Sequence, residues 1–115
     1  MRRGEICLVD LVPVRGAEAN KQRPAVIVSN DGANSTAQRL GRGVVTVVPV
    51  TSSIDRVHPF QVLLPGQTTG LSFDSKAQAE QLRSIAVERI GPIVGTLSDE
   101  LQASLDEAIR LHLGL

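Results

Sequence analysis

Two polar residues beside predicted strands have side chains suited to phosphate chemistry. Arg23 lies at the base of a long polar loop and is followed by Pro24, whose ring limits its own φ and restricts the residue before it. Thr51 follows the apolar run 44–50 and offers a hydroxyl from a rigid base. A guanidinium is a planar fork of donors that stays charged at any relevant pH. Together the two side chains would suit a phosphodiester whose transition state gathers negative charge on its oxygens.

Each of these residues also has an ordinary structural explanation when it is taken alone. Arg23 could form a surface ion pair, and Thr51 could close a turn with its hydroxyl. Glu80 and Gln81 could be outward residues of a solvated strand, and Glu18 a loop carboxylate. The chemical interpretation therefore depends on the three polar segments acting together, namely residues 16–24, 48–52 and 74–84.

The elements that must position these segments are mostly strands. Short runs of β-branched residues bounded by Gly, Pro, Asn and Asp predict strands at 6–12, 25–29, 44–50 and 60–64. Residues 71–85 predict either one long bent strand or two short ones. The run 44–48 is apolar on both faces apart from Thr46, which places it in the middle of a sheet or under a partner subunit. Pro49 has no amide donor and predicts a strand end.

Two segments have the pattern of helices. Residues 31–40 predict a short helix after an Asn or Asp cap, whereas residues 66–70 predict a turn. Ser98 predicts the N-cap of a terminal helix that Gly114 ends. Its apolar stripe is expected to contain Leu101, Leu105, Ala108, Ile109 and His112. The predicted fold class is mainly β, a small, strongly curved barrel with the terminal helix packed on its outside.

Length and composition indicate one ordinary globular domain over residues 1–115. The chain is 42% hydrophobic and 21% charged, and no apolar run approaches the roughly 20 residues that a membrane helix needs. We see no signal peptide, and we expect no membrane association. The single cysteine, Cys7, is expected to be an inert buried thiol that supports neither a disulfide framework nor a metal-ligand set. A cytoplasmic location without metal or cofactor is therefore expected.

Charge is balanced overall but unevenly distributed. Residues 1–60 carry eight basic and five acidic side chains, and residues 61–115 carry four and seven, so the two parts have net charges of +3 and −3. The first part includes Lys21, Arg23 and Arg56, and it would give the molecule one basic surface if the two parts stay distinct in the fold. With no Trp or Tyr and only two Phe, a surface that stacks several bases on aromatics is excluded. His58 has no second histidine nearby in the sequence and is not expected to act as a catalytic acid.

Seven short motifs follow one another along the chain: Arg3-Gly-Glu-Ile, Val9-Asp-Leu, Gly16-Ala-Glu, Arg23-Pro-Ala-Val, Val28-Ser-Asn, Val50-Thr and Glu80-Gln-Leu-Arg-Ser-Ile. This ordered set resembles the MazF/PemK (Kid-like) toxin family of endoribonucleases. The resemblance implies an SH3-like barrel, a homodimer, metal-independent cleavage of single-stranded RNA at short sequences, and a MazE-like antitoxin that occupies the RNA groove. It makes Arg23 the catalytic arginine and Thr51 the catalytic threonine. The residues expected to contact RNA are Glu18, Lys21, Ser52, Arg56, Ser75, Glu80 and Gln81.

The chemistry implied by the resemblance agrees with the residues present. RNA carries its own nucleophile, the 2′-hydroxyl, so the enzyme needs only to position it and to stabilise the phosphorane. The sequence departs from the family at Cys7, where an aromatic residue is common, and at residues 20–22, where glycine is common. Two alternatives remain open: a non-enzymatic CcdB-like toxin that binds DNA gyrase, and a catalytically silent barrel that only binds RNA or protein.

Overall fold

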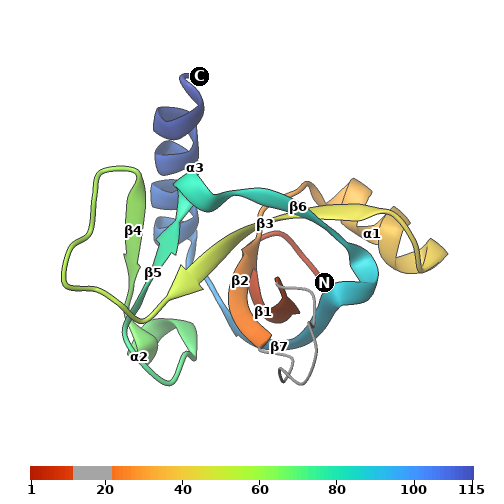
Figure 1. The fold of residues 1–115 in the computed structure, drawn as a ribbon, viewed down its shortest axis with the longest axis horizontal. Coiled ribbons are helices and arrows are strands. Elements are labelled where there is room, and N and C mark those ends of the chain that lie inside the picture. Colours follow the sequence, from red (N-terminus) through yellow and green to blue (C-terminus); the bar gives the residue numbers. More distant parts are fainter. Residues whose placement is uncertain (12–21) are drawn as a thin grey trace, which may run out of the picture.

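The computed structural model describes residues 1–11 and 22–115. This part of the chain is mainly β and forms one strongly curved sheet with three α-helices around it (Figure 1). The helices are α1 (Asp31–Leu40), α2 (Gly66–Thr69) and α3 (Asp99–Leu113), and two short 3-10 turns are η1 (Ala79–Gln81) and η2 (Val87–Arg89). The strands are β1 (Glu5–Asp10), β2 (Gln22–Ile27), β3 (Val44–Thr51), β4 (Gln61–Leu64), β5 (Ser75–Gln78), β6 (Arg83–Ala86) and β7 (Ile90–Thr96).

The sheet is antiparallel and has the order β4-β5-β3-β2-β1-β7, with β6 also paired to β3. From β6 the chain passes through η2 into β7, which pairs with β1, so the strands curl most of the way around (Figure 1). Among the described strands the ladder is not continued between β6 and β7, and the sheet does not close. The predicted fold class, a mainly β barrel-like sheet with a terminal helix, is confirmed. Of the two options for residues 71–85, the structure shows two short strands, β5 and β6.

Strand β3 lies in the middle of this sheet, as its apolar pattern predicts. It pairs with β2 on one side and with β6 and then β5 on the other. Val45, Val47 and Val48 are at most 1% exposed, so the chain itself covers them, whereas Val44 remains 62% exposed. The prediction that Pro49 ends the strand is wrong, because β3 continues to Thr51. The pairing with β6 stops at Val47 and that with β5 starts at Val50, so on that side the missing amide of proline costs no ladder hydrogen bond.

Strand β7 was not expected from the sequence, because it contains two glycines and a proline. Both glycines are explained by the close approach of neighbouring backbone. A Cβ at Gly95 would lie 2.2 Å from the carbonyl oxygen of Thr69 in α2, and one at Gly91 would lie 2.7 Å from that of Leu8 in β1. The absence of side chains therefore lets α2 and β1 approach the backbone of β7 closely.

The helices begin where the sequence predicts. Asn30 Oδ1 accepts a hydrogen bond from the amide of Ala33 at the start of α1, and Ser98 Oγ accepts one from the amide of Leu101 at the start of α3. The turn expected at residues 66–70 is the single helical turn α2. α3 packs against β4 and η1, outside the curled strands (Figure 1). The expectation that His112 packs on the apolar stripe is wrong, because the buried face of α3 ends at Ile109 and His112 is exposed.

Alternate residues of the same strands face two hydrophobic clusters, as the two-residue period of a strand requires. In β1, Ile6 belongs to the cluster beneath α3, and Cys7 belongs to the cluster beside α1. Val26 and Ala25 divide in the same way in β2. Within residues 1–11 and 22–115, no helix is both long enough and apolar enough to cross a membrane.

Candidate active site

An open cavity of about 380 Å³ brings together four of the residues predicted from the sequence: Arg23, Thr51, Ser52 and Ser75. It lies where β2 and β3 reach the segment 70–75. Arg23 is the one charged side chain among the described residues that line it. The cavity therefore offers a cation and several hydroxyls, which is a suitable environment for a phosphate group.

The register of the sheet explains why Arg23 and Thr51 meet. β2 and β3 are antiparallel, and their last paired residues are Ala25 and Pro49. Arg23 lies two residues before Ala25 and Thr51 two residues after Pro49, so both come just beyond the same end of this ladder, where they line one cavity. Arg23 is exposed in β2, so the loop position expected for it is corrected to a strand position. Thr51 ends β3 and is half-buried, with its Oγ1 accepting a hydrogen bond of 3.2 Å from the amide of Ser53.

The two serines of the cavity differ in what their hydroxyls can do. Ser52 is exposed and follows Thr51 directly. Ser75 is only 5% exposed, and its Oγ donates a hydrogen bond of 2.9 Å to the carbonyl oxygen of Phe73. The Ser75 side chain therefore braces the neighbouring loop, and its donor is already used.

Three other predicted residues lie outside the cavity lining. Arg56 is exposed in the segment between β3 and β4, and its carbonyl oxygen accepts a 2.6 Å hydrogen bond from the Lys76 Nζ. Glu80 lies in η1, where its Oε2 accepts a 2.5 Å hydrogen bond from Gln61 Nε2. The other oxygen, Oε1, is buried without a hydrogen-bond partner among the described residues. Gln81 follows Glu80 and is exposed. The predicted residues Glu18 and Lys21 lie outside the described residues.

Several residues of the site were missed by sequence reasoning. Phe73 lines the cavity and is 72% exposed. The only available signal was that it is one of two phenylalanines in a chain without Trp or Tyr. Lys76 and Gln61 are buried polar residues, 9% and 8% exposed, that hold the segment between β3 and β4. Nothing in their local sequence distinguishes them from exposed strand residues.

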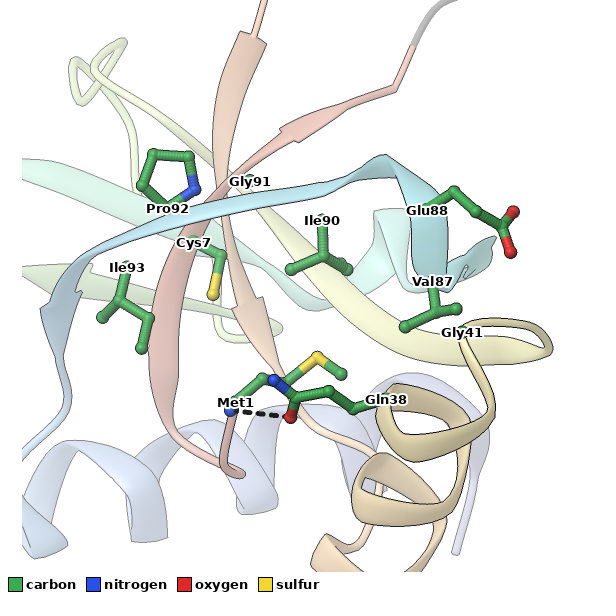
Figure 2. Close-up of a pocket in the computed structure, with 10 residues that line it drawn as sticks. All are labelled: Met1, Cys7, Gln38, Gly41, Val87, Glu88, Ile90, Gly91, Pro92 and Ile93. Carbon is green, nitrogen blue, oxygen red and sulfur yellow. Dashed lines mark hydrogen bonds between the residues drawn. The ribbon is translucent and has the colours of Figure 1, made fainter.

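A larger hollow of about 490 Å³ lies elsewhere and contains none of the predicted site residues (Figure 2). It is formed by β7, β1, α1 and the first residue, whose amino group donates a 3.2 Å hydrogen bond to Gln38 Oε1. Its lining is mostly apolar and includes Cys7, which is 0% exposed. Burial, and after it the charge of Glu5, raises the pKa of the Cys7 thiol. The predicted burial of Cys7 is confirmed. The raised pKa favours the thiol over the reactive thiolate, which agrees with the expectation of an inert cysteine.

Comparison with known families identifies the fold that carries this site. Residues 2–113 match the model of the PemK-like, MazF-like toxins of type II toxin–antitoxin systems. The chain belongs to this family. The resemblance seen in the sequence motifs is thereby confirmed, and the CcdB-like alternative is not supported.

A curated relative and two solved structures of toxins are similar over nearly the whole chain. Endoribonuclease MazF9 of Mycobacterium tuberculosis is 67% identical over 115 residues, which is 100% of this chain and 98% of that protein. The crystal structure of MazE-MazF (Form-II) from Deinococcus radiodurans has a TM-score of 0.78 at 24% identity, covering 100% of this chain and 96% of that one. An endoribonuclease in complex with its cognate antitoxin, from Mycobacterial species, has a TM-score of 0.75 at 22% identity, with 100% and 96% covered. At these low identities the two structures support the fold of this PemK/MazF chain.

Proposed function

We propose that this PemK/MazF chain is an endoribonuclease toxin that cuts single-stranded RNA at short sequences without a metal ion. The observation that supports the proposal is the cavity that Arg23 of β2 and Thr51 of β3 line together. The 67% identity to a protein named Endoribonuclease MazF9 over its whole length supports the same activity. Cleavage of cellular RNA would inhibit translation and growth, which is the role expected of a toxin.

In the proposed reaction, the RNA supplies its own nucleophile. The 2′-oxygen attacks the adjacent phosphorus and loses its proton, the bond from phosphorus to the 5′-oxygen breaks, and that oxygen takes up a proton. The products are a 2′,3′-cyclic phosphate and a 5′-hydroxyl. The Arg23 guanidinium donates hydrogen bonds to the phosphorane oxygens, where negative charge develops, and Thr51 orients the phosphate through its hydroxyl.

RNA outside the cleaved bond is proposed to bind residues around the cavity. Ser52 and Arg56 are exposed on the segment that follows β3, and they would contact the backbone directly. Ser75 and Glu80 support this surface through their hydrogen bonds to Phe73 and Gln61. We retain Gln81, Glu18 and Lys21 as further RNA-binding residues.

We propose that a MazE-like antitoxin occupies the same surface. An acidic segment that imitates the phosphate chain would meet the same cationic side chains, Arg23 and Arg56, that bind RNA. RNA and antitoxin should then compete, and both should bind more weakly as salt rises. Labelled, uncleavable RNA bound to an Arg23 variant and titrated with an acidic antitoxin peptide tests the idea. Simultaneous binding of both ligands to one groove would contradict it.

A homodimer acting in the cytoplasm is part of the proposal. The buried run 45–48 no longer argues for it, because the chain's own core covers these residues. Support comes instead from three exposed apolar side chains. Leu40 and Val44, 54% and 62% exposed, line a shallow hollow beside α1, and Ile93, 52% exposed, lines the apolar hollow of Figure 2. A protein that sediments as a monomer at micromolar concentration would contradict the dimer.

Substitution of the two proposed catalytic residues tests the function. Arg23→Ala should lower the cleavage rate by about 10²–10³, as is usual for the loss of one donor to a developing oxyanion. Arg23→Lys should recover only part of the rate, because an ammonium lacks the planar fork of donors. The matched control is Arg39→Ala, an exposed arginine in the last turn of α1. If Arg23→Ala cuts RNA at the rate of the Arg39 variant, the assignment of Arg23 is wrong.

A further inference from the structure

The side chain of Phe73 is unusually exposed for its size and lies in the proposed active site. It is 72% exposed and lines the same cavity as Arg23 and Thr51. Phenylalanine is among the residue types most often buried, and ligand cavities typically combine apolar or aromatic side chains with a few polar groups, as this cavity does. The cleavage chemistry proposed at the phosphate gives this ring no role.

The backbone that carries this exposed ring is held at several points. The Phe73 carbonyl oxygen accepts the hydrogen bond from the buried Ser75, and Asp74 Oδ1 accepts a 2.9 Å hydrogen bond from the amide of Gly66. Gly66 also permits close packing, because a Cβ there would lie 2.7 Å from the Leu71 carbonyl oxygen. The ring is thus presented to solvent by a fixed loop, and little ordering is needed when a ligand binds.

We propose that Phe73 stacks on a base of the RNA next to the cleaved phosphate; this inference rests on the proposed nuclease function. Arg23 and the hydroxyls of Thr51 and Ser52 suit the phosphate, and the adjoining ring supplies an apolar face on which any base can stack. The other phenylalanine, Phe60, is already stacked on His58, with ring centroids 5.1 Å apart and planes 8° apart. Of the two phenylalanines in the chain, Phe73 is therefore the one whose ring can stack on a base, and it provides a single stacking position.

A single tryptophan gives a direct signal for this contact. The chain contains no Trp and no Tyr, so Phe73→Trp introduces one isolated fluorophore at the cavity. The probe is an RNA oligonucleotide that spans a mapped cut site and carries deoxyribose in place of the attacking 2′-hydroxyl. Stacking on a base should quench the fluorescence of Trp at this position in a saturable way. The control is Leu113→Trp, on the exposed end of α3, whose fluorescence should not change.

Affinity measurements with abasic RNA identify the stacked base. Phe73→Ala and Phe73→Leu should weaken binding about 5- to 150-fold, the range usual for one base stacked on one ring, whereas Phe73→Trp should bind as well as the natural protein. Removing the stacked base from the RNA should weaken the natural protein equally and should have no further effect on Phe73→Ala. Sedimentation of Phe73→Ala should be unchanged.

Three results would overturn the inference, and each is distinct. In the first, the protein cuts RNA normally, but the losses of affinity caused by Phe73→Ala and by removal of a base add up at every abasic position. The stacking role would then be wrong, and the nuclease assignment would stand. Dissociation of an oligomer by Phe73→Ala would assign the ring to a contact between copies of the chain. If the natural protein cuts no RNA at all, the proposed function fails, and the stacking role fails with it.

Discussion

Replacing the buried Lys76 by methionine should loosen the surface that binds RNA while leaving the chemical step almost unchanged. Lys76 is 9% exposed in β5, where it lies opposite Thr51 of β3 on one side and Leu63 of β4 on the other. Its ammonium donates a 2.6 Å hydrogen bond to the carbonyl oxygen of Arg56, in the segment between β3 and β4. Lys76 does not line the cavity of Arg23 and Thr51, so it acts as a positioning residue.

The expected change in the free energy of unfolding of Lys76→Met is the difference between two opposing effects. A hydrogen bond from a charged donor contributes about 1.5–3 kcal/mol, but removal of a buried ammonium also relieves its desolvation cost. Methionine fills most of the space, and Arg56 is exposed, so water can reach the carbonyl that loses its partner. We expect the free energy of unfolding to fall by about 1–2 kcal/mol. The KM for RNA should rise several-fold, and kcat should stay within a factor of about two.

Urea unfolding and steady-state cleavage of a short RNA measure these quantities. The matched control is Arg83→Met, because Arg83 Nη1 also donates to a carbonyl oxygen, that of Leu11 at 3.2 Å, but from an exposed position. That variant should lose less than about 0.5 kcal/mol. The reasoning is refuted if Lys76→Met is no less stable than Arg83→Met. It is also refuted if kcat falls tenfold with KM unchanged, because Lys76 would then act on the reacting phosphate.

Three further predictions concern the packing around the site and the two ends of the fold. Gly66→Ala would bring a Cβ to 2.7 Å from the Leu71 carbonyl, and it should destabilise the protein by about 1–3 kcal/mol in urea unfolding; a variant as stable as the natural protein would contradict this. Burial acts to raise the pKa of Asp106, but the hydrogen bonds from Arg3 and Gln102 outweigh it and lower that pKa. Asp106 therefore adds stability above its unfolded pKa of about 3.9 and loses it as pH falls through the lower folded value. The cost of Asp106→Asn should be about 1 kcal/mol at pH 7 and should shrink as pH falls below the unfolded pKa. Cys7 should react with an alkylating reagent only after unfolding, as mass spectrometry with and without urea would show; rapid labelling of the native protein would contradict its burial.

The sequence allows the parts of the fold with a local pattern to be predicted. The run 44–48 is apolar on both faces apart from Thr46, which predicts a place for β3 in the middle of a sheet or under a partner subunit, and the structure shows the first. The capping residue Ser98 predicts the start of α3. β7 could not be found in this way, because its glycines resemble a turn. Gly95 is required by the approach of Thr69 from a helix far away in the sequence, and such a contact leaves no trace in the residues around it.

The candidate site likewise contains residues that the sequence marks and residues that it does not. Arg23 and Thr51 could be selected from the sequence, because family motifs mark them, and in the structure both line one cavity. Phe73, Lys76 and Gln61 could not, because their importance depends on where other segments lie. A lysine in a strand is ordinarily exposed, and only the segment between β3 and β4 folding over β5 makes Lys76 a buried donor.

The chemistry of the RNA ends tests the central claim most directly. The purified protein and its Arg23→Ala variant are incubated with a long RNA in excess EDTA, and the new ends are mapped and characterised. The account predicts discrete cuts by the natural protein that leave 5′-hydroxyls and 2′,3′-cyclic phosphates, at a rate about 10²–10³ above that of the variant. Ends that carry 5′-phosphates, cleavage that stops when EDTA is added, or equal rates for the two proteins would contradict it.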